Sequence, residues 1–282
     1  MSTAPLTSAA VDAAIVANAE PPHRAHLGAS VIGRPCDRQL WYGFRWALAE
    51  KHEARMLRLF ERGQLEERRF VGYLKAIGVE VWETNPETNK QWRISDIEGH
   101  FGGSLDGVGR GIPDLPADEA FVLEFKTHGE KSFAKLKDEG LLKAKWEHYV
   151  QTQVYMGKMG LNYALYVAVN KNTDDLHFEI VKFNQDEFDR ALLRARLIIF
   201  GNIRPRINES PAYFACKFCH LQKMCHFGGV QPDRNCRTCV NGKVGGNGLW
   251  QCQLDHHYLD EPAQRAACDQ YQASPVFTQR GP

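Results

Sequence analysis

The sequence contains no apolar run that approaches the ~20 residues needed to cross a bilayer as a helix. It also lacks a charge excess of either sign, since 35 Lys and Arg against 34 Asp and Glu leave a formal net charge of +1. The first absence excludes a membrane protein built on helical spans. The second means that the whole-chain balance gives no support for nucleic-acid binding, although a local basic groove can lie within a neutral total.

The segment 1–22 is rich in alanine and lacks the basic start and strong apolar stretch of a secretory signal. We interpret it as part of a lead-in, with one short helix over Ala9–Ala19, and we expect a cytoplasmic protein. In a reducing compartment, clustered cysteines are more often metal ligands than disulfide partners. The eight cysteines of this chain therefore suggest metal binding.

The 282 residues, 43% of them hydrophobic, suffice for one large domain or two smaller ones. Periodicity predicts an α/β stretch up to about residue 210, after which Cys, Gly and His become dense. A long helix is predicted over 52–77, with an apolar face that includes Phe60, Leu65, Phe70, Leu74 and Ile77. Strands are predicted over 79–83, 91–110, 120–126, 163–170 and 176–183, and further helices over 36–46, 132–142, 145–159 and 185–203.

Two acidic motifs lie in this stretch: Asp106 in the turn GSLDG at 103–107, and Glu124-Phe125-Lys126 on a predicted strand. Side chains alternate across a strand, so Glu124 and Lys126 share a face while Phe125 points into the core. Asp106 and Glu124 suit a hard cation, Mg²⁺ or Mn²⁺, with the carbonyl of Phe125 as a third ligand. Such a metal site suits the hydrolysis of a phosphodiester. In that reaction Lys126 can reach the attacking water or the phosphate. Alone, a Glu-x-Lys pair is also typical of a half-exposed strand.

Three more residues complete the predicted catalytic set. Gln151 and Tyr155 lie one turn apart on a predicted helix and share a face, from which they can brace Lys126 or touch the DNA backbone. Glu67, or its neighbour Glu66, can complete the metal ligands from the long helix. The predicted catalytic residues are Asp106, Glu124, Lys126, Gln151 and Tyr155, and the predicted ligands of the catalytic metal are Glu67, Asp106, Glu124 and Phe125.

This ordered set resembles the PD-(D/E)xK nuclease superfamily, and more closely its RecB-like and lambda-exonuclease-like branch. The resemblance spans roughly residues 30–225. It implies an α/β fold with a restriction-endonuclease-like core, in which helices flank a mixed sheet, and metal-dependent cleavage of DNA. Many RecB-like members carry a His on the early helix, whereas this chain offers Glu66 and Glu67 there, as the exonuclease branch does.

Four cysteines are split around the predicted core: Cys36 precedes it, and Cys216, Cys219 and Cys225 follow it. Four thiolates suit Zn²⁺ or an iron–sulfur cluster, and their spacing does not choose between the two. Cys36 can alternatively be a buried apolar residue. The split resembles the iron–sulfur staple of AddB-type nucleases and of the CRISPR adaptation nucleases of the superfamily. That resemblance implies a [4Fe–4S] cluster on these residues, with Zn²⁺ as the alternative.

A second group, Cys236-x2-Cys239-x12-Cys252 with Cys268 beyond, lies in a tail that the resemblance does not cover. Cys-x2-Cys in a Gly-rich knuckle indicates a metal site, and a structural Zn²⁺ suits it best. Cys268 would complete a four-thiolate set, while His256 or His257 could also close the tetrahedron. We predict that this cysteine-rich metal-binding C-terminal extension stabilises the chain, with contact to DNA or a partner as the alternative.

These features predict a lead-in at 1–29, a nuclease domain at 30–229 closed by the split four-Cys cluster, and a metal-binding tail at 230–282. The predicted activity is a metal-dependent DNA exonuclease that acts on DNA ends in recombination, repair or DNA processing. By resemblance this is a phage or prophage exonuclease, with a recombination or single-strand-binding protein as a further partner. The alternative is a metal-stapled DNA-binding or adaptor module with a non-catalytic nuclease core. A zinc transcription factor is disfavoured, because the tail lacks a basic recognition helix.

Overall fold

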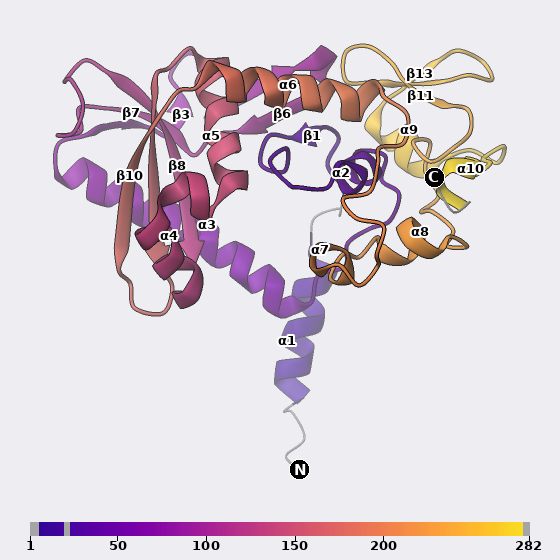
Figure 1. Cartoon of the computed structure of the whole chain (residues 1–282), viewed down its shortest axis with the longest axis horizontal. Coiled ribbons are helices and arrows are strands. Elements are labelled where there is room, and N and C mark those ends of the chain that lie inside the picture. The colour runs from indigo at the N-terminus through magenta and orange to yellow at the C-terminus, as the bar shows by residue number, and fades with distance from the viewer. Residues whose placement is uncertain (1–5, 20–22, 279–282) are drawn as a thin grey trace. The chain divides into compact units, whose positions relative to one another are not determined.

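The computed structural model describes residues 6–19 and 23–278 (Figure 1). The chain forms two compact units, each assembled from separated segments. Unit 1 is Met1–Pro22, Lys51–Arg93 and Ser104–Gln185, and unit 2 is His23–Glu50, Ile94–Gly103 and Asp186–Pro282. The predicted domain limits at 29/30 and 229/230 stay predictions. No helix in the described ranges is both long and apolar enough to span a bilayer.

Unit 1 is built on a five-stranded mixed sheet with the order β10-β9-β8-β7-β2. Neighbouring strands pair antiparallel except β8 and β9, which are parallel. A parallel pair needs a crossover connection, and α4 (Glu130–Ala144) and α5 (Trp146–Met159) supply it. The strands are β2 (Glu80–Trp82), β7 (Gly107–Arg110), β8 (Ala120–His128), β9 (Tyr163–Asn170) and β10 (Leu176–Lys182).

The long helix α3 (Ala54–Ala76) packs on one face of this sheet through Phe70, Val71 and Leu74. Strand residues at every second position of β8 and β9 complete the same buried cluster: Phe121, Leu123, Phe125, Leu165, Val167 and Val169. Because side chains alternate across a strand, the intervening residues of β8 face the other side of the sheet. Helix α5 lies on that side, where Gln151 contacts Glu124.

The predicted apolar face of α3 is only partly confirmed. Phe60, Leu65 and Ile77 are exposed, although the sequence predicts them on the apolar face. The α3 residues of the buried cluster all come from the C-terminal half of the helix, which leaves Phe60 and Leu65 outside it, and Ile77 follows the last residue of the helix. The N-terminal half runs beside α1 (Leu6–Ala17), where Arg58 forms an ion pair with Asp12.

The segment predicted as one or two strands over 91–110 is divided into more pieces. It contains the end of a hairpin between β3 (Thr84–Asn85) and β4 (Lys90–Gln91), then β5 (Arg93–Asp96), β6 (Phe101–Ser104) and β7. A short 3₁₀ turn over Ile97–Gly99 separates β5 from β6, and Glu98 takes a left-handed backbone conformation there with φ 54°. That conformation ends the extended backbone, which the apolar alternation alone does not reveal.

Unit 2 contains the remaining elements of the described chain. It has two small sheets. The first has the order β1-β6-β5, in which β1 is Leu27–Gly28, and the second has the order β11-β12-β13. The strands of the second sheet are β11 (Gly242–Val244), β12 (Trp250–Cys252) and β13 (Tyr258–Leu259). The helices are α2 (Asp37–Phe44), α6 (Gln185–Phe200), α7 (Phe214–Lys217), α8 (Gln222–Phe227), α9 (Glu261–Ala266) and α10 (Pro275–Thr278).

The C-terminal segment of unit 2 has regular structure and core contacts that the sequence did not predict. Phe277 packs on Trp41 and Tyr42, with ring centroids 5.4 and 6.0 Å apart, and Trp250 packs on Phe44 at 5.7 Å. Phe277 and Trp250 are almost fully buried. Strands of two or three residues carry too little periodicity to be recognised in the sequence.

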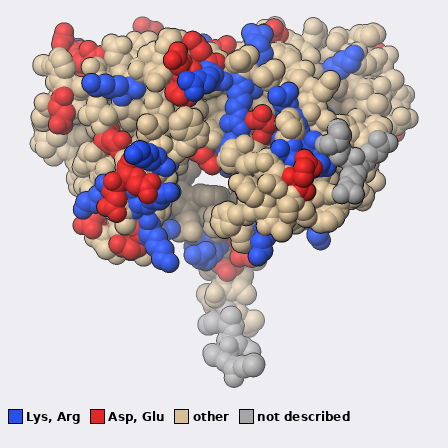
Figure 2. Space-filling view, viewed as in Figure 1, with Lys and Arg blue, Asp and Glu red and all other residues tan. Residues whose placement is uncertain are grey.

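Charge is mixed on the visible surface. Figure 2 shows Lys and Arg interspersed with Asp and Glu on the face in view. This pattern agrees with the formal net charge of +1.

Candidate functional site

Strand β8 carries the centre of the candidate active site. Glu124 is fully buried and forms an ion pair with Lys126, two positions further on the same face. Phe125 points the other way and packs on Phe70, with ring centroids 5.1 Å apart. The alternation predicted from the sequence is therefore the alternation observed, with the charged pair on one face and the aromatic ring in the core.

Asp106 lies in the turn between β6 and β7, directly beside β8. Its Oδ2 accepts a hydrogen bond of 2.6 Å from the backbone N–H of Phe125. Burial raises the pKa of Asp106, and the charge of Lys126 and this hydrogen bond act against the rise. Asp106 and Glu124 are thus anchored at adjacent positions, although 18 residues separate them in the sequence. This bond uses the N–H of Phe125, and a metal-ligand role for the Phe125 carbonyl stays a prediction.

The long helix α3 presents Glu67 to this site. Burial raises the pKa of Glu67 to about 7, and the Asp106 carboxyl adds to the rise. Its neighbour Glu66 is engaged elsewhere, because its carboxylate forms ion pairs with Arg69 at 2.7 Å and Arg62 at 3.9 Å. Of the two candidate acids on α3, the structure brings Glu67 to Asp106 and Lys126.

Helix α5 holds the site from the other side. Gln151 donates a hydrogen bond of 3.1 Å to Glu124 Oε2 and one of 3.2 Å to the Tyr155 hydroxyl. Tyr155 in turn donates to the backbone carbonyl of Ser104 at 2.8 Å, next to the turn that carries Asp106. Gln151 therefore orients the carboxylate of Glu124, whereas the sequence suggests Lys126 or DNA as its partner.

The donor set fits a hard divalent cation. Burial raises the pKa of Glu124 to about 7; Lys126 opposes this rise and Asp106 adds to it. Burial also disfavours the charge of Lys126, but Glu124 and Asp106 together raise its pKa. One ammonium cannot balance three carboxylates, so the ionised cluster lacks positive charge. The ligand oxygens of the three carboxylates do not all lie within 4.8 Å of one another in the described chain. Carboxylate oxygens are the ligands that Mg²⁺ takes, together with several waters.

A hydrogen-bonded chain next to the site escaped the sequence analysis. His128 Nε2 and His148 Nδ1 lie 2.9 and 2.8 Å from the hydroxyl of Tyr166, which pairs with Glu124 across β8 and β9. Burial lowers the pKa of His128 to about 4 and that of His148 to about 2, with nearby lysines adding to both shifts. The signal was present in the period-two series Glu124, Lys126, His128.

The split cysteine set comes together in unit 2. Cys36 caps the N-terminus of α2, where its sulfur accepts a hydrogen bond of 3.4 Å from the N–H of Gln39. Cys36, Cys216, Cys219 and Cys225 line one cavity. Burial raises the pKa of the thiols of Cys216, Cys219 and Cys225, and Cys36 adds to each rise. Four free thiols on one cavity are a suitable donor set for a thiophilic metal or cluster.

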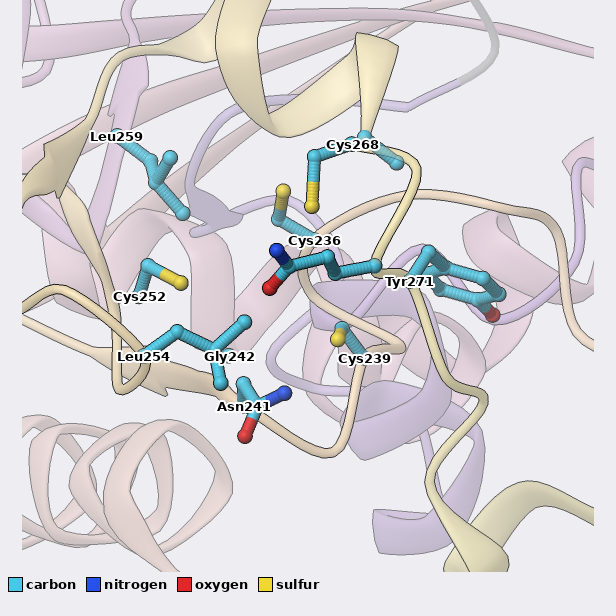
Figure 3. A pocket seen from close by; sticks show the side chains of 11 residues that line it. Cys236, Cys239, Asn241, Gly242, Cys252, Leu254, Leu259, Cys268 and Tyr271 are labelled. Atoms are coloured by element: carbon cyan, nitrogen blue, oxygen red, sulfur yellow. The ribbon is translucent and has the colours of Figure 1, made fainter.

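The tail cysteines also converge within unit 2. Cys236, Cys239, Cys252 and Cys268 line a second cavity, which Figure 3 shows from close by. His256 and His257 are not among its lining residues. His257 instead belongs to an exposed group with Cys252 and Asp255, whose ligand atoms lie within 4.8 Å of one another.

Comparison with known proteins gives structural likeness alone. No family model matches the chain, and no curated protein matches it. The crystal structure of SSO0001 overlaps 78% of this chain and 96% of its own, with a TM-score of 0.47 and 14% identity. The alkaline exonuclease LHK-Exo from Laribacter hongkongensis overlaps 67% of this chain and 90% of its own, with a TM-score of 0.42 and 15% identity. A second structure of LHK-Exo, in complex with dAMP, has the same TM-score and 16% identity.

Proposed function

We propose that this protein is a Mg²⁺- or Mn²⁺-dependent DNA nuclease, and that it acts as an exonuclease on DNA ends. The observation that carries the proposal is the clustering of the half-buried Asp106 and Lys126 around the fully buried Glu124, on one strand and one turn of unit 1. A solvated Glu-x-Lys pair on an edge strand would not be buried in this way. Removing several carboxyl groups from water beside a single lysine costs stability, and such clusters are typical of functional sites.

Each residue has a chemical role in this proposal. Asp106, Glu124 and Glu67 would hold the cation, which when bound polarises the phosphate and lowers the pKa of its water. Lys126 keeps its positive charge beside Glu124 and meets the negative charge that develops on the phosphate. Gln151 fixes the carboxylate of Glu124, and Tyr155 connects Gln151 to the carbonyl of Ser104. DNA is the proposed substrate, and recombination, repair or DNA processing the proposed setting, with a recombination or single-strand-binding protein as a further partner.

The test is cleavage of an end-labelled linear duplex and of a covalently closed circle, each with and without Mg²⁺ or Mn²⁺. We expect metal-dependent shortening of the linear DNA from its ends and an intact circle. Lys126→Ala and Asp106→Asn should each lower the rate by about 10²–10³. The matched control is Lys135→Ala, an exposed lysine of α4 that pairs with Glu139.

Two results would contradict this proposal. Full activity in Lys126→Ala would remove the cluster from the chemistry. DNA binding without cleavage under any metal condition would favour the adaptor module with a non-catalytic core.

We further propose that Cys36, Cys216, Cys219 and Cys225 hold a [4Fe–4S] cluster, with Zn²⁺ as the alternative. Their convergence on one cavity supports it, although 180 residues separate Cys36 from Cys216. Binding at such a site closes a very long loop and contributes directly to folding. We expect anaerobically purified protein to be coloured, with about four iron atoms per chain, as the formula of the cluster requires. Cys36→Ser should be colourless and less stable. Zinc without iron would establish the alternative.

A further inference from the structure

The four cysteines that line the tail cavity come from three separate segments of the chain. Cys236 and Cys239 lie on one loop, Cys252 ends β12, and Cys268 follows α9. Figure 3 shows the sulfur atoms of Cys236 and Cys268 pointing toward one another, with Cys252 and Cys239 on the other sides of the same space. Burial raises the pKa of Cys236 to about 11, and Cys239, Cys268 and Cys252 add to the rise. All four cysteines therefore border the same cavity.

The loop between Cys236 and Cys239 is folded as a tight knuckle. The N–H of Cys239 donates to the carbonyl of Cys236 at 3.4 Å, and the N–H of Gly242 donates to the carbonyl of Cys239 at 3.1 Å. A Cβ at Gly242 would lie 1.9 Å from the Cys236 carbonyl oxygen, so a side chain cannot fit there. Gly242 also pairs with Cys252 across β11 and β12. The backbone thus sets three of the four cysteines beside each other.

Four thiolates can hold a structural zinc in a closed tetrahedron without an open position for chemistry. Zinc–sulfur bonds of ~2.3 Å put the sulfur atoms ~3.8 Å apart. No three of the four sulfur atoms lie within 4.8 Å of one another in the described chain. Zinc binding at these residues therefore requires the cysteine side chains to move closer together. The binding of zinc replaces four thiol protons, which leave to solvent, and requires no oxidant or reductant.

The competing ligand group is less suited to a structural metal. Cys252, Asp255 and His257 lie close together but Asp255 and His257 are exposed. The closeness of Asp255 and His257 needs no metal, because the Asp255 carboxylate is hydrogen-bonded to the ring of His257. The carboxylate also lies 3.5 Å from the N–H of His257. Cys268, by contrast, lines the cavity of the other three cysteines.

Arg237 connects the knuckle to α2, the helix that Cys36 caps. It lies between Cys236 and Cys239 in the sequence, and it is 2% exposed. Its guanidinium donates hydrogen bonds of 2.9 Å to the carbonyl of Phe44 and 2.8 Å to that of Ala25, and it stacks 3.7 Å above the ring of Trp46. A buried guanidinium is stable only where such acceptors satisfy it, so the position of the knuckle and that of the Phe44 carbonyl depend on each other.

Further contacts tie the same loop to the residues after α2. Asn235 donates to the carbonyl of Trp46 at 3.0 Å, and the N–H of Asp233 donates to that of Ala47 at 2.8 Å. Phe44 is the last residue of α2, and Cys36 is its N-terminal cap. Helix α2 therefore has Cys36 at its N-terminus, while its last residue, Phe44, accepts a hydrogen bond from Arg237 of the knuckle.

We propose that Cys236, Cys239, Cys252 and Cys268 bind one Zn²⁺ in a closed structural site, and that the zinc-bound knuckle fixes α2 through Arg237 and so positions Cys36. The zinc site does not depend on the proposed nuclease activity. The positioning of Cys36 rests on the proposed cluster at Cys36, Cys216, Cys219 and Cys225.

Zinc at the tail is tested by metal analysis and by X-ray absorption at the zinc edge on full-length protein purified anaerobically. We expect one zinc per chain beside the iron, with a sulfur shell at ~2.3 Å and no nitrogen or oxygen ligand. Cys268→Ser should lose zinc or its fourth sulfur, while His257→Ala should keep both. A shell at ~2.0–2.1 Å in the wild type, or loss of zinc in His257→Ala, would overturn the four-thiolate site. This spectrum needs no variant, so poor folding of a cysteine variant does not weaken it.

The connection to α2 is tested by Arg237→Ala, which leaves all eight cysteines in place. We expect zinc to stay at one per chain while the visible absorption of the cluster decays at least tenfold faster. The matched control is Lys243→Ala, an exposed cation of β11. Unchanged cluster decay would overturn the connection. So would loss of zinc together with iron, because Arg237 would then act on the knuckle itself. Both results are read without DNA, so a failure of the nuclease proposal is distinguishable from a failure here.

Discussion

Gln151 on α5 holds Glu124 on β8 through a hydrogen bond of 3.1 Å between Nε2 and Oε2. Both side chains are buried. The bond joins the crossover helix to the strand of the candidate active site, and it leaves Glu124 Oε1 to the ion pair with Lys126. The orientation of a carboxylate proposed as a metal ligand thus depends on a neutral amide.

Removal of that amide should slow cleavage more than it disturbs folding. A hydrogen bond to a buried charged group contributes about 1.5–3 kcal/mol, so Gln151→Ala should lower the cleavage rate roughly 10- to 100-fold. The matched control is Gln153→Ala on the same helix, which loses bonds to Lys182 and Asn184 but none to Glu124. Rates and thermal unfolding of both variants decide the matter. An equal loss of rate in the two variants would show that Gln151 acts only through folding.

The adjacent acids of α3 should behave differently. Glu67→Gln removes a carboxylate that interacts with Asp106 and should weaken binding of the activating metal by at least about tenfold. Glu66→Gln breaks the ion pair with Arg69 and should lower the unfolding temperature while leaving metal activation unchanged. The measurement is cleavage rate against Mn²⁺ concentration. Weaker metal activation in Glu66→Gln alone would reverse the assignment.

The imidazoles of His128 and His148 should make unit 1 sensitive to acid. Their folded pKa values, about 4 and about 2, lie below the ordinary value of 6.5. At these two residues the unfolded chain therefore binds more protons below pH 6.5. Their contribution to stability is complete above that pH and falls as the pH drops, to about pH 4 for His128 and to about pH 2 for His148. Each imidazole contributes a slope of roughly 1.4 kcal/mol per pH unit. The charged and titratable groups around the pair are Lys126, Lys145, Lys171, His177 and Tyr166.

Urea unfolding of the full-length protein at pH 5 and pH 7.5 measures this sensitivity. We expect His148→Gln to reduce the difference in midpoint between the two pH values. His256→Gln, a change at an exposed residue, should leave it unaltered. An unchanged pH difference in His148→Gln would show that other groups cause the loss of stability in acid.

Gly242→Ala should disrupt the tail knuckle, because the added methyl would lie 1.9 Å from the carbonyl oxygen of Cys236. We expect lower zinc content and a lower unfolding temperature. Gly246→Ala is the control, since its Cβ would meet only the side chain of Glu98 at 3.5 Å. The comparison is zinc per chain in the two purified variants. Wild-type zinc content in Gly242→Ala would show that the knuckle is not the metal site.

The sequence alone determined what depends on the local period of the chain. The strand Tyr163–Asn170 has its predicted bounds, and the alternation over β8 correctly separates Glu124 and Lys126 from Phe125. The helical spacing of Gln151 and Tyr155 places both on one face. These features follow from a residue's direction relative to its own element, which the spacing along the chain specifies.

Tertiary structure decided which of several equivalent residues meet. Glu66 and Glu67 are adjacent and chemically alike, and only the packing of α3 brings Glu67 to Asp106. Cys268 reaches the tail cavity and His257 does not, and Arg237 binds the carbonyl of Phe44 across 193 residues. Such contacts arise when separate elements pack together, and no local pattern encodes them. The residue types that each site needs can therefore be identified in the sequence, whereas the packing of the elements decides which of these residues come together.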